Sequence, residues 1–125
     1  MLVRRVNGSS LELYENGTEL ILGITETVVN GDLLMKLRGI LRNDLVYEFD
    51  DELSAAVSVG KNVVLDFSDV RYIASAALKT LLRMQQKIDI SNSGQEMRIS
   101  NASDEVMKVF SESGLINLLQ FEGRE

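Results

Sequence analysis

Apolar and polar residues alternate through the first third of the chain, around two Asn-Gly pairs at residues 16–17 and 30–31. Asn-Gly favours the positive φ angles of a type I′ turn, whose twist matches a tight β-hairpin. The pattern therefore predicts a meander of three strands: Leu11 to Glu15, Thr18 to Val29 and Asp32 to Arg38. Gly23 offers no side chain for packing within the second strand, so we expect a bulge or bend there, or a division of the strand in two.

The apolar spacing becomes helical after the meander. Apolar residues recur every three or four positions from Val46 to Val57, and Gly60 ends this predicted helix. The run from Asn62 to Phe67 is short, continuous and rich in β-branched residues. Such a run is typical of a strand buried on both faces of a sheet, so we expect it at the centre of the fold.

The rest of the chain repeats this order. A predicted loop from Ser68 to Ala74 leads into a second helical pattern from Ser75 to about Ile88, and Glu96 to Ser100 alternates as a strand does. Ser103, followed by two carboxylates, predicts a capped helix start. Leu115 to Phe121 forms an apolar run that fits either a final short helix or an edge segment.

This order of elements predicts an α/β fold. A mixed central sheet would carry an N-terminal β-meander, with about three or four helices packed on it and right-handed crossovers between parallel neighbours. The fold class becomes α+β if the strands of the meander outnumber the parallel strands. At 125 residues and 45% apolar content, we expect one domain.

Composition argues against an enzyme, a cofactor and a metal centre. The chain has no cysteine and no histidine, which removes the thiolate nucleophile, the sulfur ligand and the imidazole base. No phosphate-binding loop is present, because Gly60-Lys61 precedes a strand instead of following one. The densest carboxylate group comprises Asp44, Asp50, Asp51 and Glu52. It is better explained as a solvated helix start than as a magnesium site.

Net charge and hydropathy limit the classes of partner that the chain is expected to bind. The chain carries 13 basic and 19 acidic side chains, for a net charge of −6, so its field would repel nucleic acid. No apolar run approaches the roughly 20 residues that a bilayer-spanning helix needs. We therefore expect a cytoplasmic protein with no direct membrane insertion.

The stretch RYIASAALKTLL places one hydroxyl, that of Ser75, among three alanines at a strand-to-helix junction. Two roles fit this position. The hydroxyl can cap the helix, or it can accept a phosphoryl group whose negative charge the helix dipole would favour. Spacing alone favours the cap.

Three basic residues, Lys79, Arg83 and Lys87, recur every four positions and so align on one face of the helix that follows. A solvated face and a docking stripe for an acidic partner both explain them.

Three segments of the chain resemble the STAS domain family, the sulphate-transporter and anti-sigma-factor-antagonist fold. VVLDFSDVRYIASAALKTLLRMQQK resembles its central strand and helix start. GDLLMKLRGIL resembles its second strand and L-x-G-x-L turn, and NASDEVMKVFSESGLINLLQF resembles its closing segment. The resemblance implies a STAS-like domain over residues 24–121, an N-terminal extension with an extra strand or hairpin over 1–23, and a tail over 122–125. Leu11 to Glu15 would then extend the sheet or offer an exposed edge to another chain.

The resemblance also implies a function and a partner. In bacterial members, a serine kinase that doubles as an anti-sigma factor phosphorylates a serine, which falls on Ser75 here, and phosphorylation breaks their complex. The chain would thus be an anti-sigma-factor antagonist in a partner-switching system that regulates transcription, and a homodimer is left open. The implied partner-binding residues are Asp69, Arg71, Ala74, Ala76, Lys79, Arg83, Arg42 and Asp44.

The serine motif differs from that of the family around this residue. The family's aspartate, second hydroxyl and glycine are Ala74, Ala76 and Ala77, and an aspartate common after the turn glycine is Arg42. These differences change the surface that a kinase would read. The alternative function is a non-phosphorylated structural or scaffold subunit of a larger complex, or an accessory to a membrane transport system.

Overall fold

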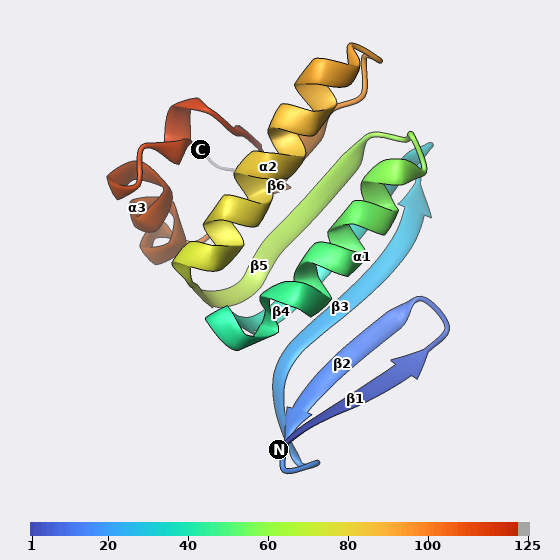
Figure 1. The fold of residues 1–125 in the computed structure, drawn as a ribbon, viewed down its shortest axis with the longest axis vertical. Coiled ribbons are helices and arrows are strands. Elements are labelled where there is room, and N and C mark those ends of the chain that lie inside the picture. The colour runs from blue at the N-terminus through green and yellow to red at the C-terminus, as the bar shows by residue number, and fades with distance from the viewer. Residues whose placement is uncertain (123–125) are drawn as a thin grey trace.

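Residues 1–122, which the computed structural model describes, form a seven-stranded mixed sheet whose strands lie in sequence order (Figure 1). The strands are β1 Leu2–Asn7, β2 Ser10–Glu15, β3 Glu19–Val29, β4 Asp32–Leu41, β5 Val63–Ile73, β6 Met97–Ser100 and β7 Gln120–Glu122. The helices are α1 Val46–Ser58, α2 Ser75–Ser91 and α3 Asp104–Glu112, with 3-10 turns η1 Asn43–Leu45 and η2 Leu115–Asn117. The predicted α/β fold, a mixed sheet with an N-terminal meander, is confirmed.

The meander has one more strand than its pattern predicts. β1 to β4 pair antiparallel in succession, and Asn16 and Asn30 have the positive φ angles expected of their turns. β1 escapes the sequence pattern because Arg4 and Arg5 interrupt its apolar residues. Since β1 covers the outer side of β2, the segment Leu11 to Glu15 extends the sheet and is not an exposed edge.

Gly23 does not divide its strand, and the predicted bulge lies elsewhere. β3 is continuous, and its register shifts just before Gly23, opposite Leu13 and Tyr14 of β2. The side chain of Arg38 lies against Gly23, and a Cβ atom there would come within 2.7 Å of the arginine Nε. Close contact with Arg38, therefore, explains the glycine.

The central strand is longer than predicted. β5 runs parallel to β4 and β6 and continues to Ile73, so the segment Ser68 to Ala74 is mainly strand and not a loop. The cause is tertiary, because β4 also continues to Leu41, which pairs with Ile73. The N–H of Ala74 then donates to the carbonyl oxygen of Leu41 at 2.8 Å. Ala74 alone separates β5 from α2.

One face of the sheet is covered by helices, and the opposite face carries charged side chains. α1 and α2 lie side by side across the sheet (Figure 1). Met35 and Leu37 of β4 are fully buried in the core between the sheet and these helices. Because strand side chains alternate, Lys36 and Arg38 lie on the opposite face.

The C-terminal segment is partly helix and partly strand. Its apolar run forms η2 and then β7, which pairs parallel with β6. Phe121 of β7 packs edge-on against Phe110 of α3, with ring centroids 5.0 Å apart. The predicted tail begins at Glu122, which is the last residue of β7 and pairs with Arg98 at 3.0 Å. Residues 123–125 of that tail lie outside the described residues.

Candidate functional site

The hydroxyl of Ser75 is exposed on the first turn of α2. The N-cap position belongs to Ala74, which has extended backbone angles (φ −84°, ψ 161°) and no side-chain cap. Ser75 is the first helical residue, and its hydroxyl makes no hydrogen bond to any residue that the structure describes. The interpretation of Ser75 as a cap is therefore wrong, because the helix begins one residue earlier than a Ser75 cap would require and Ala74 occupies the N-cap position.

An asparagine from another element takes the capping role. The Oδ1 atom of Asn43, in the connection between β4 and α1, accepts from the Ala76 N–H at 3.3 Å. Sequence reasoning missed this residue. The available signal was the alanine at the predicted helix start, since a helix without its own capping side chain leaves N–H groups that need another acceptor.

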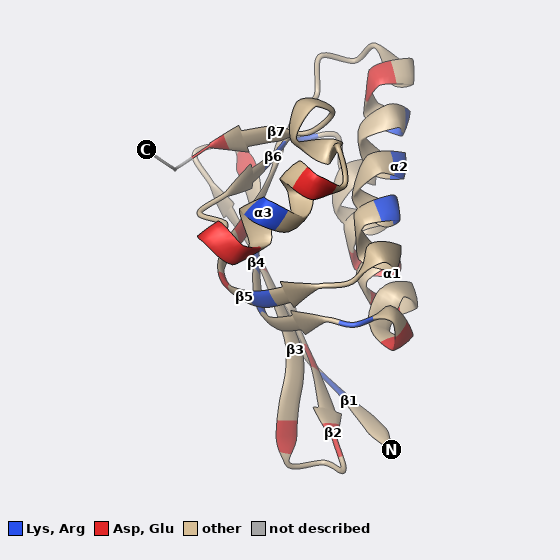
Figure 2. Cartoon of the chain, turned by 90° about the vertical axis from the view of Figure 1, so that its left-hand side faces the viewer, with Lys and Arg blue, Asp and Glu red and all other residues tan. Residues whose placement is uncertain are grey.

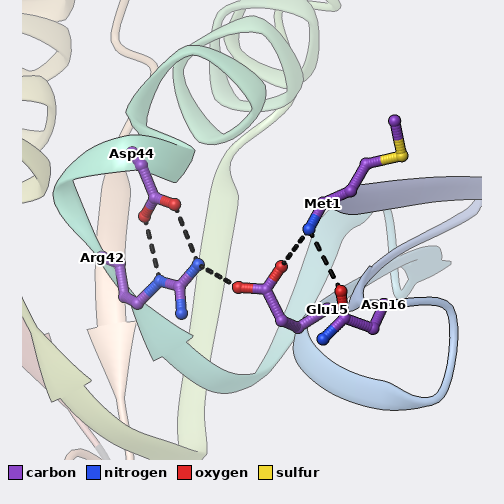
Figure 3. Close-up of polar contacts among 5 residues, drawn as sticks. All are labelled: Met1, Glu15, Asn16, Arg42 and Asp44. Carbon is purple, nitrogen blue, oxygen red and sulfur yellow. Dashed lines mark hydrogen bonds and ion pairs between the residues drawn. The ribbon is translucent and has the colours of Figure 1, made fainter.

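Charged contacts among Arg42, Asp44 and Glu15 join the start of η1 to the N-terminal hairpin (Figure 3). Arg42 donates to both carboxylate oxygens of Asp44, at 2.9 and 2.8 Å, and lies 3.7 Å from Glu15. The hydrogen bonds from Arg42 hold the pKa of Asp44 below its ordinary value, and Asp44 raises the pKa of Arg42. The amino group of Met1 lies 3.0 Å from the Glu15 carboxylate. The predicted residues Arg42 and Asp44 thus lie beside the start of α2.

A mainly apolar groove of about 220 Å³ opens next to Ser75. Its lining comprises Ser75, Leu78, Lys79, Leu82, Ser113 and Leu115. The first four belong to α2, whereas Ser113 is the C-cap of α3 and Leu115 is the first residue of η2. Sequence reasoning found the serine and the lysine but not the groove, because its two walls are far apart in the chain.

The basic stripe on α2 is only partly available to a partner. Lys79, Arg83 and Lys87 are exposed, and Figure 2 shows the basic residues of α2 on the outer side of that helix. Arg83 pairs with Asp50 of α1 at 2.5 Å. Lys79 and Lys87 form no ion pair with the described residues, so Lys79 is the unpaired cation at the groove.

Two predicted partner-binding residues lie away from the groove. The carboxylate of Asp69 pairs at 3.4 Å with Lys36, on the face of the sheet opposite the helices. Arg71 lines a separate hollow with Ser103 and the first turn of α3. Two register shifts between β4 and β5, which place an extra β5 residue before Asp69 and again before Tyr72, break the alternation of side chains and distribute these residues over different surfaces.

The described residues contain no group of three or more carboxylates placed to hold a metal ion. None of the helices between residues 1 and 122 is long and apolar enough to cross a membrane.

Comparisons with known proteins point to one family. The family model described as "Mlab, STAS domain" matches residues 26–120. The comparison with curated proteins found no match.

Several solved structures share the fold. An anti-sigma factor antagonist from Mycobacterium paratuberculosis has a TM-score of 0.73 at 14% identity, over 82% of this chain and 86% of that one. A Thermotoga maritima protein, described as a candidate anti-sigma factor antagonist, has a TM-score of 0.67 at 19% identity, over 78% and 84%. The anti-sigma factor antagonist SpoIIAA in its unphosphorylated form has a TM-score of 0.65 at 18% identity, over 81% and 89%. SpoIIAA of Bacillus is also known in its phosphorylated form.

Proposed function

The chain belongs to the STAS domain family, and we propose that it is an anti-sigma-factor antagonist-like binding module in a partner-switching system that regulates transcription. The partner would be a serine kinase that also acts as an anti-sigma factor. Similar folds described as anti-sigma factor antagonists, and one solved in both phosphorylated and unphosphorylated forms, support this proposal.

The observation that carries the proposal is the exposed, unbonded hydroxyl of Ser75 beside an apolar groove. In the switching step, the Ser75 oxygen attacks the γ-phosphorus of a nucleoside triphosphate bound to the kinase. The new O–P bond forms as the bond to the β-phosphate oxygen breaks, and the hydroxyl proton is released. The helix N-terminus and Lys79 would both favour the added phosphate.

The groove explains how one phosphate would break a complex. In the unmodified protein, Leu78, Leu82 and Leu115 offer apolar surface to a partner, and Lys79 offers a contact for a carboxylate. A phosphate near −2 charge at the edge of this groove would have to lose its water if the partner covered it, which opposes docking. Of the two neighbouring alanines predicted to bind the partner, Ala74 is buried, and only Ala76 is partly exposed beside Ser75.

The test combines phosphate mapping with binding. The protein is incubated with magnesium ATP and the serine kinase encoded beside its gene, and phosphate is mapped by mass spectrometry. We expect phosphate on Ser75, none on Ser75→Ala, and kinase binding that is at least tenfold weaker for Ser75→Asp. Leu82→Asp should weaken binding without removing the phosphate acceptor.

Two results together would overturn the proposal: no phosphate on Ser75, and equal kinase binding by the wild type and Ser75→Asp. They would favour the alternative of a non-phosphorylated scaffold subunit. The predicted cytoplasmic location, the domain boundaries at residues 23/24 and 121/122 and the homodimer remain predictions, which cell fractionation, limited proteolysis and size-exclusion chromatography would test.

A further inference from the structure

The start of α2 cannot satisfy its own backbone donors. The N–H groups of Ala77 and Leu78 both donate to the carbonyl oxygen of Ala74, at 3.0 and 3.2 Å. The methyl group of Ala74 offers no acceptor, and the first turn of α2 contains no acidic residue. The N–H of Ala76 therefore needs a partner from outside the helix.

Asn43 provides this partner from 33 positions earlier in the chain. The pairing of β4 with β5 brings it there, because Leu41 and Ile73 are cross-strand neighbours and Ala74 donates to the Leu41 carbonyl. Two residues beyond Leu41, the side chain of Asn43 accepts the Ala76 N–H. An exposed residue at the start of η1 thus performs the task that the N-cap residue performs in an ordinary helix.

The neighbours of Asn43 restrict its backbone. Arg42 and Asp44 precede and follow it, and their two parallel hydrogen bonds form a planar bidentate pair across it. Arg42 also lies 3.7 Å from Glu15 at the end of β2, which joins this segment to the N-terminal hairpin. An asparagine fixed between two paired neighbours loses little further freedom when it accepts a hydrogen bond.

We propose that Asn43 is the positioning residue of the serine site: its side chain holds the first turn of α2, and the Arg42–Asp44 pair holds Asn43. The orientation of the backbone at Ser75 then depends on the connection between β4 and α1. This inference is independent of the proposed function, because it concerns a contact within the chain and holds whether or not a kinase modifies Ser75.

Hydrogen exchange of single amides, followed by NMR on the full chain, tests the contact. In Asn43→Ala, the Ala76 amide should exchange at least roughly 5-fold faster, as expected for the loss of one capping acceptor. The Val106 amide, which the Ser103 hydroxyl caps in α3, should not change. Ser103→Ala is the matched control and should show the reverse, with faster exchange at Val106 and unchanged exchange at Ala76.

Two further variants distinguish positioning from a general loss of stability. Asn43→Asp retains an acceptor, so it should restore slow exchange at neutral pH, and the chemical shift of the Ala76 amide should then titrate with the new carboxylate. Arg42→Lys keeps the charge but loses the planar two-point contact, so its effect at Ala76 should lie between wild type and Asn43→Ala.

Unchanged Ala76 exchange in Asn43→Ala would overturn the proposal. If all amides of Asn43→Ala exchange faster, the loss of stability is general, and the Ala76 chemical shift of Asn43→Asp then tests whether residue 43 is the acceptor. An Ala76 shift that does not follow the carboxylate titration would then count against Asn43 as its acceptor.

Discussion

Two helices of this protein begin at or beside a serine, and the two serines are used in opposite ways. α3 begins after Ser103, whose hydroxyl accepts the Val106 N–H at 3.2 Å, with two carboxylates in the first turn. α2 begins after an alanine, has no carboxylate in its first turn, and leaves the Ser75 hydroxyl unbonded among the described residues. The difference shows that a serine at a helix start can leave its hydroxyl exposed when another residue, here Asn43, takes over the capping.

The largest expected effect concerns how α3 is attached. Phe110 is fully buried between Phe67 and Phe121, with ring centroids 6.2 and 5.0 Å away. Phe110→Ala should lower the free energy of unfolding by about 3–5 kcal/mol, because it leaves a cavity among large side chains. Urea denaturation measures the loss. If α2 is positioned by Asn43 and not by α3, the Ala76 amide should stay protected under conditions where the variant remains folded, and its loss of protection would contradict this.

The next effect compares the two serines directly. Ser103→Ala should cost about 1 kcal/mol of stability because it removes a cap. Ser75→Ala should change stability by less than about 0.5 kcal/mol, since it removes no hydrogen bond and alanine favours helix. Urea denaturation of both variants gives the comparison, and equal losses would show that Ser75 has a structural role as well.

A smaller effect is expected from a charge at the start of α2. Ser75→Asp places a carboxylate at the positive end of the α2 dipole, which should raise stability by about 0.3–1 kcal/mol at low ionic strength. The gain should shrink in salt because the site is exposed. Thermal unfolding with and without salt measures it. A loss of stability would contradict the view that this helix end favours negative charge.

The smallest expected effect is a pH dependence of the first turn of α2, because the Arg42–Asp44 pair holds the residue that caps it. The pKa of Asp44 is lowered by Arg42, so the pair contributes its stabilisation above the ordinary pKa of an aspartate and loses it as the pH falls through the lowered value. Protection of the Ala76 amide should decrease in that acidic range. Asp44→Asn should abolish this dependence, and a dependence that persists in the variant would assign it to another group. The pair is exposed, so the change should be modest.

The candidate site was predictable where it depends on neighbours in sequence. Ser75 was expected at a helix start and lies there. Arg42 and Asp44, which the family resemblance implied as partner-binding residues, pair on either side of Asn43, the residue that caps α2. Asp69 was expected in an interface loop but lies in a strand, where a register shift relative to β4 places it beside Lys36 on the opposite face of the sheet. Arg83 was expected to face a partner but forms an ion pair with Asp50. Neither outcome can be derived without knowing which elements become neighbours.

By itself, the sequence determined the order of the elements from β2 to α3, the Asn-Gly turns and the Ser103 cap, because each depends on residues a few positions apart. Only the tertiary structure decided that β5 continues to Ile73, that Asn43 reaches Ala76, and that α2 and η2 enclose a groove beside Ser75. These features join segments distant in the chain, and their position follows from the register between β4 and β5. The position of Ser75 among alanines at a helix start can therefore be predicted from the sequence. That Asn43, and not Ser75, caps this helix is decided by the fold.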